Sequence, residues 1–272
     1  MIETLAKNLI KLKQEFARVY SGTSNIQEII PQDTSELFPV ESKHLKLLHL
    51  FASCNPIYYD SSEEEIGGIP CMVYEGDINR FWLNSIRHTC SHAPFSPTWI
   101  FSAYIAALLS KEMGSYEIVD VGSGDGRIAY CGRILGMNSH SIEIDEMLVD
   151  LQKSIVSETK MDFNPNCSDA AKFDYTELSL SGPAFFIGGL AQMGGDILAE
   201  SIIKQIRRIS RAYMVLAGTY SKKYPLDGLD MAGWGQIIQK NGMDVLRTVS
   251  LPTAWTFREP EDTPYLFTRL TR

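Results

Sequence analysis

The sequence of 272 residues is poor in cysteine and has no closely spaced cysteine pair. The five cysteines lie far apart, and none belongs to a C-x-x-C motif: Cys54, Cys71, Cys90, Cys131 and Cys167. An odd number of widely spaced thiols suits a reduced protein better than a disulfide framework or a zinc ribbon. The cysteines therefore exclude a small domain held together by disulfides.

The sequence also lacks long apolar runs and an excess of positive charge. No stretch approaches the roughly 18 apolar residues that a transmembrane helix needs, and acids and lysines interrupt the first apolar residues. With 25 Lys and Arg against 33 Asp and Glu, the net charge is −8, so the surface repels phosphate backbones and anionic membranes. We therefore expect a cytoplasmic protein with no membrane segment and no bulk nucleic-acid binding.

The remaining patterns divide the chain into two regions. Within residues 1–94, apolar residues at helical spacing predict helices over 2–19 and 42–53, and the acidic stretch 58–68 is typical of an exposed loop. The apolar stripe of the first helix is shorter than three heptads, so it indicates internal packing and leaves the oligomeric state open. We expect 1–94 to be a helical accessory region that selects the substrate, and 95–272 to be the catalytic domain.

Residues 95–272 alternate between strand and helix patterns. Short apolar runs bounded by turn residues predict six strands, at 116–121, 139–144, 184–187, 212–217, 244–251 and 265–270. Helical patterns separate most of these strands, which is typical of βαβ units and a mostly parallel sheet covered on both faces. No segment of helix length separates the last two strands, so we expect an antiparallel hairpin at the sheet edge.

A glycine-rich motif, D-V-G-S-G-D-G-R-I, follows the first of these strands directly and precedes a helix. Glycines at every second position allow a tight turn along which a ligand can lie. The N-terminus of the following helix offers free N–H groups to a carboxylate or phosphate. A dinucleotide-binding G-x-G-x-x-G would require glycine where Arg127 stands, so NAD and FAD are disfavoured. The candidate ligand-binding residues are Asp120, Gly122, Ser123, Gly124, Asp125 and Gly126, with helix capping as the alternative role of Asp125.

Two further motifs lie at the ends of the next strands. In S-I-E-I-D, Glu143 is placed to accept hydrogen bonds from both hydroxyls of a ribose, beside Ile144. In C-S-D-A-A-K-F-D, the Asp169 carboxylate can accept a hydrogen bond from an adenine amino group while the Ala170 N–H donates to the ring. Together the three motifs predict an adenosine pocket without a phosphate cradle.

In this order the three motifs resemble motifs I, II and III of class I S-adenosylmethionine-dependent methyltransferases, over about 95–272. The resemblance implies an α/β fold with a Rossmann-like seven-stranded sheet, an antiparallel last strand, and S-adenosyl-L-methionine as cofactor. It also implies that Gly122, Ser123 and Gly124 lie along the methionine part, with Asp120 fixing the turn or binding the ammonium group through water. The segment P-F-S-P-T before the first helix resembles more particularly the protein lysine methyltransferases related to the Dot1 histone enzymes.

In this family the fourth strand ends at the reacting centre, where the sequence reads F-F-I-G-G-L-A-Q. The N-P-P-Y or D-P-P-Y of many amino-group methyltransferases is absent, and so is a Pro-Cys nucleophile. Gly188, a further cofactor-site candidate, and Gly189 leave room for an acceptor chain or serve close packing, and no catalytic residue is assigned. A lysine amine suits such a site because it needs only to lose a proton to water before attack. The leading prediction is in-line methyl transfer to an unidentified acceptor, with a protein or a small molecule favoured.

Two further residue pairs fall near the predicted acceptor side. His88 and His92 have the spacing of metal ligands, yet no third ligand lies on their face, so we predict no metal site. Tyr220 and Tyr224 follow the fifth strand, where they line an acceptor channel or are ordinary loop aromatics.

Two other functions fit the same motifs. One is transfer of the aminocarboxypropyl group of S-adenosylmethionine, as in enzymes of the nicotianamine synthase type, which have a helical N-terminal domain. The other is a non-catalytic S-adenosylmethionine-binding module, which the G-G-L-A-Q segment suggests. The product separates them, because methyl transfer leaves S-adenosylhomocysteine, aminocarboxypropyl transfer leaves methylthioadenosine, and the module leaves neither.

Overall fold

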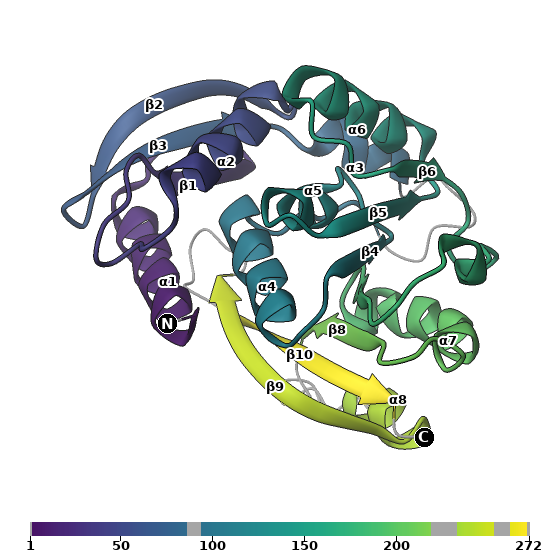
Figure 1. The fold of residues 1–272 in the computed structure, drawn as a ribbon. Helices are drawn as coiled ribbons and strands as arrows, with labels where there is room; N and C mark the ends of the chain where they lie inside the picture. The colour runs from purple at the N-terminus through teal and green to yellow at the C-terminus, as the bar shows by residue number, and fades with distance from the viewer. Residues whose placement is uncertain (1, 86–93, 219–232, 253–261, 271–272) are drawn as a thin grey trace.

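The computed structural model describes residues 2–85, 94–218, 233–252 and 262–270. These ranges contain two sheets, a large one built by the second half of the chain and a small one near the N-terminus (Figure 1). Among the residues so described, no helix combines the length and the apolar character that crossing a bilayer requires.

The large sheet has seven strands in the order β6-β5-β4-β7-β8-β10-β9. Its neighbouring strands are parallel except at β10, which runs antiparallel to both β8 and β9. This order confirms the predicted α/β fold, a Rossmann-like seven-stranded class I methyltransferase sheet with an antiparallel last strand, and it confirms the terminal hairpin. The strands are β4 (Glu117–Val121), β5 (Asn138–Glu143), β6 (Pro165–Cys167), β7 (Ala184–Ile187), β8 (Tyr213–Ala217), β9 (Met243–Pro252) and β10 (Asp262–Leu270).

Helices cover both faces of the large sheet, because side chains alternate between two cores along each strand. On β4, Ile118 belongs to the core shared with α4 and α5, whereas Val119 and Val121 belong to the core shared with α7 and α8. The helices are α3 (Asn79–Ser85), α4 (Ile100–Glu112), α5 (Arg127–Ile134), α6 (Glu146–Thr159), α7 (Gly195–Ile206) and α8 (Gly235–Lys240), with 3-10 turns at Tyr175–Leu178 and Ala191–Met193.

The N-terminal region contains a second sheet besides its helices. The helices α1 (Ile2–Val19) and α2 (Ser42–Cys54) confirm the two predicted segments. Three antiparallel strands in the order β1-β3-β2 form the small sheet: β1 (Ile26–Pro31), β2 (Tyr58–Ile66) and β3 (Ile69–Gly76). The region is therefore mixed in secondary structure and not purely helical.

The prediction of an exposed loop at 58–68 is wrong, because this stretch forms β2 and the turn into β3. Both turn glycines, Gly67 and Gly68, have positive φ, and Ile66 pairs with Ile69 across the turn, as in a tight hairpin. β2 is an edge strand whose side chains are mostly exposed. It therefore lacks the apolar alternation that identifies a strand in a sequence.

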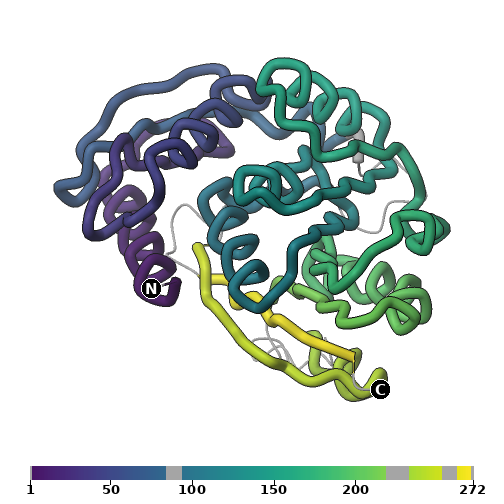
Figure 2. The backbone as a smooth tube through the Cα atoms, in the orientation of Figure 1, coloured from purple at the N-terminus to yellow at the C-terminus, as the bar shows by residue number. Residues whose placement is uncertain are grey.

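The N-terminal region shares one apolar core with the α4 face of the large sheet. Helix α1 packs against β9 and α4, and α2 packs against α4, α5 and α6. The tube in Figure 2 shows the purple first helix beside one end of the yellow terminal hairpin. The first elements of the chain thus cover the helices that flank the glycine-rich motif.

Candidate cofactor site

A cavity of about 200 Å³ opens at the carboxyl ends of β4 and β7. From β4 the chain proceeds to β5 and β6 on one side and then returns to β7 and β8 on the other. Ligands of parallel α/β sheets bind at such a reversal of strand order. The walls are the glycine-rich turn, the ends of β5, β7 and β8, the segment 94–98 and part of the terminal hairpin.

The two ends of this cavity differ in chemistry. The polar end carries the carboxyl groups of Asp120, Glu143 and Asp169 beside the glycine-rich turn. Of the eleven residues that the sequence predicts to bind the ligand, ten line the cavity and Gly126 does not. The apolar end lies at β7 and β8, where the lining side chains are Phe186, Leu190, Met193, Val215 and Ala217.

The glycine-rich turn has a left-handed backbone at three positions. The φ angles of Gly122, Gly124 and Gly126 are +66°, +59° and +77°, a region that favours glycine. A Cβ on Gly124 would lie 2.7 Å from the Phe95 ring, and a Cβ on Gly126 would lie 2.5 Å from the Phe163 ring. Gly124 is thus required where the turn meets the opposite cavity wall, and Gly126 is required by packing behind the turn.

Ser123 is buried and joins the turn to the strand and helix behind it. Its hydroxyl lies 2.6 Å from the Ser141 hydroxyl on β5 and accepts a hydrogen bond of 3.0 Å from the Gln152 amide on α6. The same Gln152 amide nitrogen donates to the Gly124 carbonyl at 2.7 Å. Buried polar groups that are bonded in this way hold a loop in one conformation.

Glu143 holds the turn from the end of β5. Its Oε2 accepts a hydrogen bond of 2.8 Å from the Gly124 N–H, and its Oε1 accepts bonds of 2.8 and 3.0 Å from the N–H groups of Ile144 and Asp145. A carboxylate offers about four lone-pair positions, so one remains for a ligand. Burial raises the pKa of Glu143 above its ordinary value, against the effect of the three N–H donors.

Asp120, at the end of β4, is a buried carboxyl group that lines the cavity. Its Oδ2 accepts a hydrogen bond of 3.2 Å from the Ala129 N–H in the first turn of α5. Burial raises the pKa of Asp120 well above its ordinary value, the Ala129 N–H opposes this rise, and the nearby charges of Asp125 and Glu143 add to it. A cation bound in the cavity would favour the ionised form of this group.

Asp169 and Ala170 follow β6 at the far side of the polar end. The Asp169 carboxylate accepts a hydrogen bond of 3.0 Å from the Ala171 N–H and lies 2.8 Å from the ammonium group of the exposed Lys172. The Ala170 carbonyl accepts a hydrogen bond of 2.9 Å from the Tyr175 hydroxyl. The third predicted motif therefore lines the same cavity as the first two.

Gly188 lies at the end of β7, close to the backbone of β4 and of the glycine-rich turn. It lines the cavity, and a Cβ added there would lie 2.5 Å from the Gly122 carbonyl oxygen and 2.8 Å from that of Val121. Its N–H also donates to the Val121 carbonyl at 2.7 Å. Because backbone atoms occupy the space that a side chain would need, close packing requires glycine at this position.

Asp125 does not cap the helix that follows it. The N-cap of α5 is Gly126, which makes no side-chain capping bond. The Asp125 carboxylate instead accepts hydrogen bonds of 2.9 and 2.5 Å from Arg127 and of 2.9 Å from the Asn55 amide. Asp125 is therefore committed to a buried ion pair at the edge of the cavity.

No sequence motif marks the residues that the terminal hairpin adds to the cavity. Pro252, Thr263 and Tyr265 line it from β9 and β10. The Tyr265 hydroxyl donates a hydrogen bond of 3.0 Å to Thr98 Oγ1, which joins the hairpin to the segment before α4. All five residues of the segment 94–98 line the cavity as well.

The predictions on His88, His92, Tyr220 and Tyr224 fall outside the described residues. Within the described part of the chain, no three His, Cys, Asp or Glu side chains gather in a way that could hold a metal ion.

No protein-family model matches the sequence, and no curated protein sequence matches it. Solved structures that resemble the fold include a putative RNA methyltransferase from Pyrococcus horikoshii, 13% identical over 71% of this chain and 99% of that chain, with a TM-score of 0.46. Another is the tRNA m1G37 methyltransferase of M. jannaschii, 15% identical over 61% of this chain and 48% of that chain, with a TM-score of 0.40.

A third similar structure is the magnesium protoporphyrin IX methyltransferase of Synechocystis PCC 6803 with bound S-adenosylmethionine. It is 16% identical over 63% of this chain and 78% of that chain, with a TM-score of 0.43. The match to the M. jannaschii enzyme spans only about half of that enzyme's length. At these identities the likenesses concern the type of fold and not the reaction.

Proposed function

We propose that the protein is an S-adenosylmethionine-dependent methyltransferase that binds its cofactor in this cavity. The observation that carries the proposal is the hydrogen bond between the Glu143 carboxylate and the Gly124 N–H. This bond sets an acid suited to a ribose against the glycine-rich turn, at the point where the strand order reverses. In the proposed complex the remaining lone pair of Glu143 accepts from a ribose hydroxyl, and Asp169 and the Ala170 N–H contact the adenine.

Charge complementarity favours a sulfonium nucleoside over a phosphorylated one. Four carboxyl groups line the cavity, those of Asp120, Asp125, Glu143 and Asp169. The only cation among the described lining residues, Arg127, is already paired with Glu28 and Asp125. A phosphate at the polar end would therefore meet charge of its own sign. The ammonium and sulfonium groups of S-adenosylmethionine are positive, and an ionised Asp120 would balance them.

The bound cofactor would supply a methyl group on a positively charged sulfur, which is already activated for in-line displacement. The chain then has to align the two reactants and exclude water. Ser123 and Glu143 hold one wall in place through their hydrogen bonds, and Leu190 and Met193 shield the opposite end. These roles need no covalent chemistry from a side chain.

The acceptor would have to supply its own nucleophile without help from a protein base. Among the described residues at the β7, β8 and hairpin side of the cavity, Thr263 and Tyr265 supply hydroxyl groups, but no carboxylate, imidazole or amine is present. An amine that loses its proton to water before attack meets this condition. A protein lysine and a small-molecule amine both fit, and the net charge of −8 disfavours RNA, which is named for two of the similar structures.

The test has two stages on the full chain. Calorimetry with S-adenosylmethionine should detect binding, and its absence would overturn the proposal. A lysate incubated with the protein and tritium-methyl-labelled cofactor should then carry label in its protein or small-molecule fraction, whereas label in nucleic acid alone would overturn a protein or small-molecule acceptor. Release of methylthioadenosine would indicate aminocarboxypropyl transfer, and binding without either product would indicate a non-catalytic module.

A further inference from the structure

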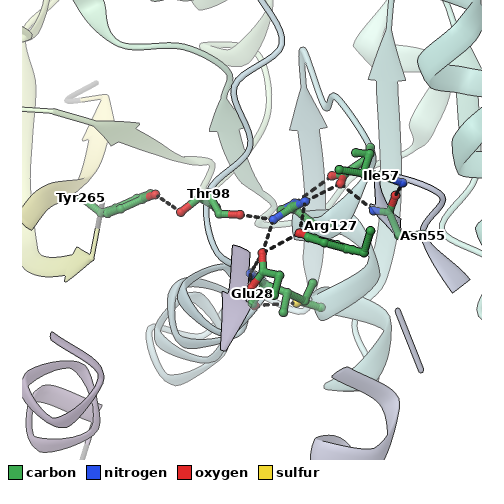
Figure 3. A network of polar contacts seen from close by, with 10 residues as sticks. Glu28, Asn55, Ile57, Thr98, Arg127 and Tyr265 are labelled. Carbon is green, nitrogen blue, oxygen red and sulfur yellow. Dashed lines mark hydrogen bonds and ion pairs between the residues drawn. The ribbon is translucent and has the colours of Figure 1, made fainter. Parts of the chain in front are cut away.

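Arg127 lies at the centre of a buried network that joins the N-terminal sheet to the cavity (Figure 3). Its Nη1 donates to Glu28 on β1 at 2.6 Å and to the Thr98 carbonyl. Its Nη2 donates to Asp125 at 2.5 Å and to the Tyr58 hydroxyl on β2 at 3.4 Å, and its Nε donates to Asp125 at 2.9 Å. The network thus links two strands of the small sheet to the glycine-rich turn and to the segment 94–98.

The bonding leaves Arg127 no donor for a ligand. A guanidinium group has five N–H donors, and the five bonds to Glu28, Thr98, Asp125 and Tyr58 use all of them. Arg127 nevertheless lines the cavity and follows the glycine-rich turn directly. Its effect on a bound cofactor must therefore pass through the groups that it holds.

Glu28 anchors this network from the N-terminal region. Its carboxylate is fully buried and accepts hydrogen bonds from the Tyr58 hydroxyl at 3.0 Å and from the Ile100 N–H at 2.9 and 3.0 Å. Ile100 begins α4, so the Glu28 carboxyl group lies at the N-terminus of that helix, an end that favours its ionised form. Glu28 therefore fixes the start of α4 and Arg127 at the same time.

Thr98 carries the effect of the network to the cavity wall. Its carbonyl accepts a hydrogen bond from Arg127, and its hydroxyl accepts one from Tyr265 at 3.0 Å. Three residues before it, the Phe95 ring faces Gly124 and packs edge-on against Phe81 of α3, with 6.2 Å between ring centroids. Figure 3 shows Thr98 between Arg127 and Tyr265, so one residue connects the buried ion pairs to the terminal hairpin.

We infer that Arg127, anchored by Glu28, is a positioning residue that sets the segment 94–98 and Tyr265 at the distance from the glycine-rich turn that cofactor binding requires. The inference rests on the proposed function and gives the N-terminal region a part in the site. It predicts that breaking the network weakens cofactor binding although the Arg127 donors are all used within the protein.

The first test compares Arg127→Met with Arg127→Lys in the full chain. The measurement is the Kd of S-adenosylhomocysteine by calorimetry, with thermal unfolding recorded on the same samples. Arg127→Met should weaken binding by about tenfold or more, and Arg127→Lys should restore part of that loss because it keeps one cation between two carboxylates. Arg133→Met is the matched control, since Arg133 lies on the same helix outside the cavity lining and donates to the Met137 carbonyl.

A double-mutant cycle distinguishes positioning from general destabilisation, and it applies even if Arg127→Met does not fold. Glu28→Gln and Tyr265→Phe change residues at opposite ends of this network, which Arg127 and Thr98 link. Positioning through Thr98 predicts non-additive effects on Kd, with a coupling of about threefold or more. Additive effects, or a wild-type Kd in folded Arg127 variants, would overturn the inference. Failure of the wild-type chain to bind would instead overturn the proposed function.

Discussion

The polar and apolar ends of the cavity are built by different means. At the polar end, each key side chain stands within a few residues of its hydrogen-bond partners or on the neighbouring strand, as Glu143 does with Ile144, Asp145 and Gly124. At the apolar end, Leu190, Ala217 and Tyr265 meet only because of the strand order of the sheet. The proposed cofactor end can therefore be recognised from short motifs, while the apolar end requires the assembled fold.

The two ends also respond differently to substitution. Bonded carboxylates and a left-handed turn leave the polar end little tolerance, because a misplaced donor or an added atom removes an interaction outright. Apolar walls lose contact area in small steps. The comparison predicts large effects on cofactor affinity at one end and small effects at the other.

The largest effect is expected for Gly124→Asp. The backbone has a φ of +59°, and the new Cβ would lie 2.7 Å from the Phe95 ring, so the turn or the ring must shift. Calorimetry should show a loss of cofactor affinity of about 100-fold or more, the cost of misplacing a binding element by about 1 Å. Gly114→Asp is the control, since Gly114 has a φ of +90° with open space around it. Equal cofactor affinity in both variants would show that the turn does not require glycine at position 124.

Gly188→Ala should disturb the close packing between the end of β7 and the glycine-rich turn, where the two ends of the cavity meet. Its methyl group would lie 2.5 Å from the Gly122 carbonyl oxygen, which belongs to the backbone and cannot rotate away. Urea unfolding should show a loss of about 1 to 3 kcal/mol, as for overpacked cores, together with weaker cofactor binding. An unchanged urea midpoint would mean that the end of β7 has room for a side chain.

Glu143→Ala tests the polar end without adding bulk. The substitution removes the partner of three N–H groups and the proposed ribose contact, so cofactor binding should weaken by about 1 to 3 kcal/mol. Calorimetry measures the difference, with Glu146→Gln on the exposed start of α6 as the control. Wild-type affinity in the Glu143 variant would remove this residue from the site.

The buried acids also predict how stability depends on pH. Burial raises the pKa of Glu28 from 4.5 to about 7, and Arg127 and the Ile100 N–H only partly oppose the rise. Between these pH values the folded chain keeps a proton that the unfolded chain loses, so stability falls as the pH rises. Urea unfolding from pH 4.5 to 7 should show a decline of up to about 1.4 kcal/mol per pH unit from this group. If the stability of a Glu28→Gln variant falls with pH as steeply as that of the wild type, the raised pKa of Glu28 is contradicted.

The smallest effect is expected at the apolar end. Met193→Ala removes part of a flexible apolar wall beside β7 and none of the hydrogen bonds of the polar end. The Kd of the cofactor should stay within about twofold, while methyl labelling in a lysate should fall because the acceptor loses contact area. A loss of cofactor affinity as large as that of Glu143→Ala would show that the two ends are not separate.

The sequence predicts the large sheet and the polar end because their signals are local. Strand, glycine-rich turn and helix follow one another without a gap around Gly122, and the acids of the next two motifs stand at strand ends. Each element therefore carries its own pattern of apolar spacing and turn residues. β6 is only three residues long and is not among the six strands predicted from apolar runs, yet Asp169 beyond it lines the cavity.

The small sheet and the Arg127 network escape prediction because their signals are not local. In β1, I-Q-E-I-I-P, every residue is buried, including Gln27 and Glu28, so burial does not follow polarity. The partner that compensates Glu28 stands 99 residues later in the chain. An acid inside an apolar run does indicate that a buried partner exists, but it does not identify that partner.

The packing of α1 against β9 has a consequence for synthesis of the protein. The apolar stripe of α1 includes Leu5, Leu9 and Phe16, which are buried in the finished fold. While the nascent chain grows, the terminal hairpin against which α1 packs has not yet been synthesised. The first helix therefore leaves the ribosome early and docks late, so a prematurely terminated chain would present this stripe to chaperones and proteases.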